Sequence, residues 1–398
     1  MNLLIKPKEV RRIIIYASIF FALLKPDSLE YIGLGWLDTL LIGCDGFVLA
    51  YLGIKMLERK FHVSSMTTCM CFLYFSMAFS TLLKSHEYYT LLKVAGPAIA
   101  TCLFTDLCMQ RRPVQYLKAV VYLLTILYTL NFITIVMYYP DGMYTTDWVV
   151  GDTYLMGFDN GMIYNFLPLC CFACLYSYVM YSKVFTGISI YAMALSLVSE
   201  IYVQSGTGMI QMALLLSLFL LIDKNIIKKL IRPLPLFAVF YLGTIAITKF
   251  RIQNYMAGFI VGVLGKDVTL TGRTYLWDYA MSVIKENPIF GIGATGRSVQ
   301  GLNGHVYPHP HCLLLDFMYK GGIFMLTSFV LLTVLFERKY KRCLSPIIRN
   351  IILATIFVFL VGEIVNSTQY KIFFWAIFVM IEYGNTLEDL RKFRLENA

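Results

Sequence analysis

Three of the five histidines lie within seven residues of one another, just before an apolar run. They are His305, His309 and His311, and the run that follows contains Asp316. Pro310 suits the first position of a helix, so we expect His311 in the first turn of a membrane-spanning helix. The helix dipole lowers the pKa of an imidazole at that place. A neutral His311 would then accept a proton or donate a hydrogen bond near physiological pH.

Two other interpretations of this histidine cluster stay open. A zinc site would use the three histidines with Asp316, but the prolines around the single His-x-His motif leave no standard ligand spacing. The histidines would otherwise be ordinary polar residues at the membrane surface. We predict a site without a bound metal.

A second candidate is Arg273, at the start of a predicted amphipathic helix. Apolar residues follow it at helical spacing, at Leu276, Ala280, Val283 and Ile284. Asn287 and Pro288 end the pattern, and we expect this helix to lie on the outer membrane surface. A cation in the first turn opposes the helix dipole, so a bound anion would explain its position. An ion pair with Asp267 or Asp278 would explain it equally well.

The glycines Gly291, Gly293 and Gly296 form a literal GxGxxG motif. A dinucleotide site needs that motif between a strand and a helix. Here a predicted helix and a proline precede it, which excludes that site. We expect a glycine turn whose exposed backbone N–H groups hold an anion.

The composition is that of a membrane protein. Of the 398 residues, 58% are hydrophobic and only 15% are charged, where soluble globular proteins have roughly 45–50% and about 25%. This excludes a soluble enzyme of two ordinary domains. The net charge of +10 is expected to gather in cytoplasmic loops, so it does not indicate nucleic acid as a partner. Most of the ten cysteines lie in apolar runs, which favours buried thiols over disulfides or metal ligands.

The hydropathy predicts an all-α polytopic membrane protein with about twelve transmembrane helices. The apolar runs lie near residues 13–24, 31–54, 64–83, 90–108, 116–138, 161–181, 187–204, 208–222, 233–248, 310–336, 350–365 and 370–383. With the N-terminus in the cytoplasm, most Lys and Arg residues fall on cytoplasmic segments, as the positive-inside rule requires. Both termini are then cytoplasmic. The first run is expected to stay uncleaved, because no small-residue cleavage site follows it.

This topology leaves two sizeable segments outside the cytoplasm. Residues 139–160 hold four aspartates among aromatic residues and no Lys or Arg, which suits sugar binding, although an interfacial aromatic belt has the same composition. Residues 249–309 form the only long loop, and long ordered loops are usually functional. We therefore divide the chain into nine helices (1–248), a catalytic loop with its amphipathic helix (249–309), and three helices with a cytoplasmic tail (310–398).

The long loop resembles the signature of the bacterial O-antigen ligase and polysaccharide polymerase superfamily. That signature has a Gly-Arg pair, a Trp four residues after the Arg, Pro-x-x-Gly-x-Gly, and later His-Asn with a glycine about eleven residues after the His. The matching residues are Gly272, Arg273, Trp277, Pro288, Gly291, Gly293, His311 and Gly322. Two positions depart from the pattern: Cys312 replaces the usual Asn, and Gly206 replaces the Arg of an upstream Ser-Arg-Gly.

The resemblance implies a GT-C-like membrane glycosyltransferase at the outer face of the bacterial cytoplasmic (inner) membrane. The donor would be a glycan on undecaprenyl diphosphate and the acceptor another lipid-linked glycan, with no cofactor. Arg273, helped by Arg251 and the glycine turn, would stabilise the leaving diphosphate. His311, with His309 as second choice, would orient or deprotonate the attacking hydroxyl.

Further residues are predicted to bind substrate. Lys249, Arg251 or Arg297 would replace the cation missing at Gly206. Glu200 is an acid near the outer end of a membrane helix, where acids are commonly functional; it would bind the acceptor or make a structural hydrogen bond. The predicted substrate-binding set is Arg251, Arg297, Lys249, Gly291, Gly293, Gly296, Trp277, Glu200 and Asp316.

Two functions compete under this resemblance, and a flippase is a rival from a different class. A polymerase joins lipid-linked repeat units, and a ligase passes finished polymer to a lipid or cell-wall acceptor. The departure at Gly206 and the lack of a ligase-specific feature favour the polymerase. A lipid-linked oligosaccharide flippase should show two similar halves, and the sequence has no clear internal repeat. A chain-length regulator and a flippase of the same pathway are the expected protein partners, beside the lipid bilayer.

Overall fold

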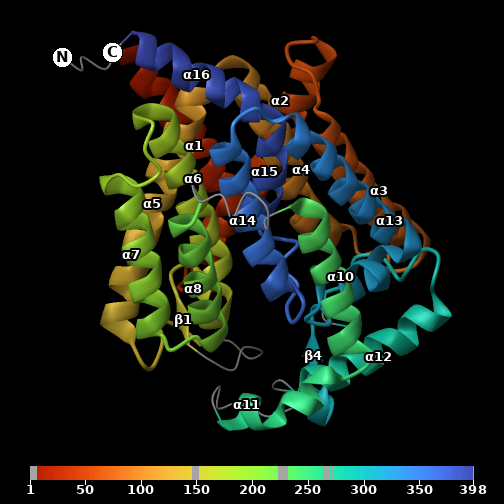
Figure 1. Ribbon diagram of the computed structural model, residues 1–398. Helices are drawn as coiled ribbons and strands as arrows, with labels where there is room; N and C mark the ends of the chain where they lie inside the picture. The colour runs from red at the N-terminus through yellow and green to blue at the C-terminus, as the bar shows by residue number, and fades with distance from the viewer. Residues whose placement is uncertain are drawn as a thin grey trace.

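The computed structural model describes residues 7–145, 152–222, 232–262, 269, 272–296 and 298–397. The described part is mostly helical (Figure 1). Its α-helices are α1 (Pro7–Leu24), α2 (Gly35–Leu57), α3 (Ser65–Leu83), α4 (Tyr88–Arg111), α5 (Pro113–Tyr138), α6 (Ile163–Tyr181), α7 (Gly187–Tyr202), α8 (Gly206–Leu220), α10 (Pro233–Thr248), α11 (Ala257–Gly262), α12 (Arg273–Glu286), α13 (Leu313–Arg342), α14 (Pro346–Glu363), α15 (Ile372–Met380) and α16 (Gly384–Glu396). Two small antiparallel pairs complete it: β1 (Thr153–Tyr154) with β2 (Gly157–Phe158), and β3 (Val299–Gln300) with β4 (Val306–Tyr307).

The long helices make this a polytopic membrane protein. Among the described residues, seven helical segments are long and apolar enough to cross a membrane: α2, α3, α4, α5, the segment Asp159–Tyr181 that contains α6, α13 and α14. The helices α7, α8 and α10 are apolar but shorter. Each of the twelve predicted apolar runs contains a helix, which confirms the all-α class. The count of twelve membrane crossings stays a prediction.

Local sequence signals set several helix starts. Prolines occupy the first position of several helices, among them α5, α10 and α14, at Pro113, Pro233 and Pro346. Proline is suited to that place because its missing N–H has no partner there in any helix. At α3 the Ser64 hydroxyl accepts a hydrogen bond from the Thr67 N–H over 3.2 Å, which caps an otherwise unpaired donor.

The centre of the bundle is formed by helices that are apolar on all sides. Every residue of α6 from Ile163 to Val179 is buried, as are all nine residues of α15. In contrast, α2 lies at the edge and exposes Trp36, Phe47 and Leu57. A helix that is apolar all round belongs in the interior of a bundle, and exposed apolar side chains on α2 suit contact with lipid.

The two ends of the bundle differ. The start of α1 and helix α16 lie at one end, and α11, α12 and β4 lie at the other (Figure 1). The amphipathic α12 runs across that second end and buries Leu276 and Ala280 against Val299 and Tyr319. This confirms the predicted helix and its apolar face. It also places the long loop and the chain termini at opposite ends.

Two predicted membrane helices have different bounds. The run 310–336 becomes a helix only from Leu313, and Gly322 interrupts it with φ 61° and ψ −155°. The Ile323 N–H donates to the Pro288 carbonyl over 3.0 Å, outside the helix, which fixes the break. The run 370–383 becomes the nine-residue α15 followed by a 3₁₀ turn, Ile381–Tyr383, that leads into α16.

Candidate active site

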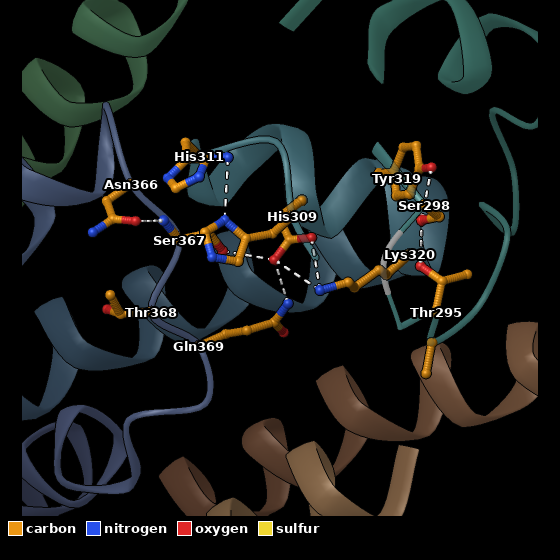
Figure 2. A network of polar contacts seen from close by, with 12 residues as sticks. Thr295, Ser298, His309, His311, Tyr319, Lys320, Asn366, Ser367, Thr368 and Gln369 are labelled. Carbon is orange, nitrogen blue, oxygen red and sulfur yellow. Dashed lines mark hydrogen bonds and ion pairs between the residues drawn. The ribbon is translucent and has the colours of Figure 1, made fainter. Parts of the chain in front are cut away.

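His309 and His311 lie against each other just before α13. Their ring centroids are 4.4 Å apart, and the His311 backbone N–H donates to His309 Nδ1 over 3.2 Å (Figure 2). His311 has φ 49°, in the left-handed region, and Cys312 is the N-cap of α13. The prediction that Pro310 begins the helix and that His311 lies in its first turn is therefore wrong. A residue in the left-handed region cannot belong to a right-handed helical turn.

Both imidazoles are held neutral, by a different cause from the one predicted. Burial lowers the pKa of His309, and the charges of Lys320 and Arg273 lower it further. Burial also lowers the pKa of His311 well below its usual value, assisted by His309 and Arg273. Asn366 and Asp316 act in the opposite direction on His311 but more weakly. Desolvation and the Arg273 charge, rather than a helix dipole, keep the His311 imidazole unprotonated at neutral pH.

Arg273 is the first residue of α12, near enough to the histidines for its charge to act on them. Its charge acts on both histidines and on the Tyr164 hydroxyl of α6. The structure therefore brings together three residues that the sequence predicted as a group, His309, His311 and Arg273. A neutral base beside a fixed cation can take a proton while the cation stabilises a departing anion.

Trp277 joins α12 to the histidine segment. Its ring is fully buried, and its Nε1–H donates to the His311 carbonyl over 3.4 Å. The Arg251 guanidinium lies 5.2 Å from the ring centroid and forms an ion pair of 2.5 Å with Asp278. Asp278, which we considered as a partner of Arg273, thus pairs with Arg251. The Arg251 guanidinium therefore packs against the Trp277 ring. The Nη1 of Arg251 has no hydrogen-bond partner among the described residues.

Asp316 is the centre of a buried polar network whose other members, Lys320, Ser367 and Gln369, are labelled in Figure 2. Its carboxylate lies 3.0 Å from Lys320 Nζ and accepts hydrogen bonds from Ser367 Oγ at 2.6 Å and Gln369 Nε2 at 2.5 Å. Ser367 and Gln369 belong to the connection between α14 and α15. The carboxylate that we predicted to bind substrate is engaged by protein groups and fixes that connection beside the histidines.

Two residues near the histidine pair were missed by sequence reasoning. Asn366, in the α14–α15 connection, lies beside His311 and Tyr164. The hydroxyl of Tyr164 is buried and makes no hydrogen bond that meets normal geometry within the described ranges. A signal for Asn366 exists, because residues 366–369 are four successive polar residues between two apolar runs. Nothing in the sequence distinguishes Tyr164 from the other tyrosines of the apolar runs.

The glycine turn packs against protein, and most of its N–H groups donate to protein acceptors. The Ile292 and Gly293 N–H groups donate to the carbonyls of Tyr319 and Lys320 over 2.8 and 2.9 Å. The Ala294 N–H donates to Thr81 Oγ1, and the Gly296 N–H to Glu87 Oε2, both over 2.8 Å. The expectation of exposed N–H groups that hold an anion is therefore contradicted.

Glycine is required in this turn for steric reasons. Gly291 and Gly293 have φ values of 66° and 86°, where other residues are strained. A Cβ on Gly291 would lie 2.6 Å from the Tyr319 carbonyl oxygen, and one on Gly293 would lie 2.6 Å from Thr81 Cα. The turn packs the end of α12 against α3 and against the part of α13 that Gly322 interrupts.

The remaining predicted residues lie away from the histidine pair or outside the described residues. Glu200 is fully buried at the end of α7, against Ser205 and Gly208 at the start of α8. Lys249 is exposed, with Nζ 5.7 Å from the Phe250 ring. Asp267 and Arg297 fall outside the described residues. No group of three His, Cys, Asp or Glu side chains in the described part is arranged to hold a metal, so the zinc alternative finds no support there.

Comparison with known proteins gives an independent view of this region. Residues 191–330 match the family model described as O-antigen ligase. The predicted superfamily resemblance is confirmed. The match to the O-antigen ligase and polysaccharide polymerase superfamily runs from α7 into α13 and includes Arg273, Trp277 and the histidine pair. Asn366 and Tyr164 lie outside it.

A curated relative points in the same direction. Over 100 residues the chain is 33% identical to the exopolysaccharide production protein ExoQ of Rhizobium meliloti (strain 1021). The aligned stretch covers 22% of this chain and 23% of that protein, so it compares less than a quarter of either. No solved structure matches the chain. The two matches are thus partial similarities, one to an O-antigen ligase model and one to an exopolysaccharide production protein.

Proposed function

We propose that the protein is a polysaccharide polymerase of the outer face of the cytoplasmic membrane. The single observation that carries this proposal is the contact between His309 and His311 near Arg273, at the end of the bundle opposite the chain termini. The donor would be a growing glycan on undecaprenyl diphosphate, and the acceptor a repeat unit on the same lipid. The match to an O-antigen ligase family supports this choice of chemistry.

The reaction is a displacement at the anomeric carbon of the donor sugar. A hydroxyl oxygen of the acceptor forms the new bond to that carbon, and the bond from the carbon to the diphosphate oxygen breaks. The hydroxyl proton passes to His311, whose buried Nδ1 has no hydrogen-bond partner in the part of the chain that the structure describes. Undecaprenyl diphosphate leaves with the electron pair of the broken bond.

Arg273 would stabilise the charge that grows on the leaving diphosphate. A guanidinium suits this task because it stays charged and presents several N–H donors to phosphate oxygens. Its charge also lowers the pKa of both histidines, which keeps the base unprotonated before the acceptor arrives. One cation thus keeps the proton acceptor unprotonated in the resting state and stabilises the leaving group. No metal and no cofactor enters this scheme.

A ligase is the alternative within the same superfamily. It would use the same donor and the same residues but transfer finished polymer to a lipid or cell-wall acceptor. The departure at Gly206 and the lack of a recognisable ligase-specific feature in the sequence are what favour the polymerase. The proposal places the end with α12 outside the cytoplasm and both termini inside, and it expects a chain-length regulator and a flippase as pathway partners.

A deletion strain separates these functions. It would be complemented with the wild type, Arg273→Ala, His311→Ala or the control His305→Ala at equal membrane levels. Surface glycan and lipid-linked precursors are then compared on gels. A polymerase predicts single repeat units in the deletion strain and a restored ladder with the wild type and His305→Ala only. Accumulation of long undecaprenyl-linked polymer would identify a ligase, and precursors trapped on the cytoplasmic face would contradict glycosyl transfer.

A further inference from the structure

A hollow lined by tyrosines lies far from the histidine pair, where α6 ends. It has a volume of about 630 Å³ and is lined by Tyr122, Tyr176, Tyr181, Lys183, Phe185, Thr186, Gly187 and Ile188. A second hollow of about 320 Å³ lies on the other side of the same turn and shares Lys183 and Phe185. Tyr164 and Tyr181 are at opposite ends of α6, about 25 Å apart at 1.5 Å per residue. This region is therefore separate from the candidate active site.

Lys183 is the formally charged residue that lines both hollows. It is exposed and forms no ion pair or hydrogen bond with any residue of the described ranges. The neighbouring charges are already neutralised, because Arg391 pairs with Glu388 over 2.5 Å. Arg391 also donates from Nη1 to Ser182 Oγ over 3.1 Å, and Ser182 has φ 55°. The turn that carries Lys183 is thus held in place while the ammonium group itself stays unpaired.

The hollow lies at one end of a segment that could cross a membrane. The segment Asp159–Tyr181 is long and apolar enough to cross a membrane, and the hollow opens at its last residue. Tyrosines are enriched at membrane–water interfaces because the ring is apolar and the hydroxyl is polar. The rings of Tyr122 and Tyr181 both lie edge-on to Tyr176, with centroids 6.4 and 6.2 Å away. These three rings form an apolar wall beside a free cation.

We propose that this hollow binds the headgroup phosphate of an anionic phospholipid. Lys183 would pair with the phosphate, the tyrosine hydroxyls would contact the headgroup oxygens, and the aromatic rings would cover the glycerol and the first methylenes of the acyl chains. Basic pockets between transmembrane helices bind such headgroups. The site needs no assumption about the reaction at the other end.

Retention of lipid by the purified protein tests this proposal. The full chain would be extracted from membranes that contain phosphatidylglycerol and phosphatidylcholine, and bound lipid would be counted by native mass spectrometry as detergent is exchanged. We expect the wild type to retain phosphatidylglycerol in preference to phosphatidylcholine. Lys183→Ala should weaken this retention about fivefold, since one basic residue contributes about that factor near a membrane surface. Lys183→Arg should keep most of it.

Lys60→Ala is the matched control, because Lys60 is an exposed lysine in the turn between α2 and α3. This variant carries the same charge change and should retain lipid like the wild type. Equal retention by Lys183→Ala and wild type, or equal retention of the neutral lipid, would overturn the proposal. Displacement of the lipid by millimolar glycerol phosphate would also overturn it, because the site would then recognise a free phosphate.

Discussion

The histidine pair and the glycine turn belong to one sequence motif, yet their polar groups are used in opposite ways. His311 has a buried Nδ1 without a hydrogen-bond partner within the described part, and its pKa is lowered by burial and by nearby charge. In the glycine turn, the N–H groups from Ile292 to Ala294 all donate to acceptors on α3 and α13. Unpaired polar groups are rare in protein interiors and call for a ligand or a reactive role. The comparison separates the histidine pair, which is expected to act on substrate, from the glycine turn, which holds the surrounding helices in place.

The largest expected effect is on activity at the histidine end. His311→Ala removes the proton acceptor and should lower the rate of glycosyl transfer about 10²- to 10⁴-fold. Arg273→Ala should fall in the same range, because it removes the charge that stabilises the leaving group. Transfer rates per milligram of purified protein measure this, and thermal unfolding should stay close to that of the wild type. If the variants lose thermal stability and keep their transfer rate, these residues support the fold and do not act on substrate.

The next largest expected effect is on the stability of the protein, in the buried network around Asp316. Asp316→Ala leaves Lys320 buried without its partner, which is expected to cost about 3–5 kcal/mol. The double variant Asp316→Leu with Lys320→Met removes both charges and should recover part of that loss. Asp278→Ala is the contrasting control, since the exposed pair with Arg251 should contribute about 0–1 kcal/mol. Equal melting temperatures for Asp316→Ala and Asp278→Ala would show that the buried network does not support the fold.

A smaller loss of stability is expected in the glycine turn. Gly293→Ala forces a strained backbone and a contact with Thr81, at a cost of about 1–3 kcal/mol. Gly296→Ala is the matched control, because the nearest atom to its new Cβ would be Glu87 Oε2 at an ordinary 3.5 Å. Melting temperatures of the two variants give the difference, and activity per folded molecule should match the wild type. A Gly293→Ala protein that is stable but inactive would instead support an anion-binding role for the turn. The backbone hydrogen bonds of the turn contradict that role.

The smallest expected effect is the pH dependence of stability and of transfer rate. An ordinary histidine becomes protonated near pH 6.5, but burial and the Arg273 charge lower the pKa of His311. The folded state therefore binds fewer protons than the unfolded state, so stability from this group is present above the ordinary pKa and declines as pH falls below it. Transfer rates should be equal at pH 7.5 and pH 6 and decline only at lower pH. A half-maximal rate near pH 6.5 would indicate an exposed, ordinary histidine.

The features that sequence predicted well are those set by local pattern. Helix α12 has the expected start at Arg273 and the expected stop before Pro288, because apolar spacing and the Asn-Pro stop are local signals. The conformation of His311 was missed, because Pro310 equally suits a helix start and a turn that precedes one. The partners of Asp316 were missed since Ser367 and Gln369 lie some fifty residues further along the chain. Contacts of that kind depend on packing, which periodicity does not encode.

The most direct test of the account uses purified protein in liposomes with lipid-linked repeat units from the producing cell. Formation of polymer would be followed on a gel after a single addition of substrate. The account predicts a ladder with the wild type and with His305→Ala, and no ladder with His311→Ala, although all three proteins remain folded. A ladder of normal length and rate with His311→Ala would contradict the claim that the histidine pair carries the chemistry.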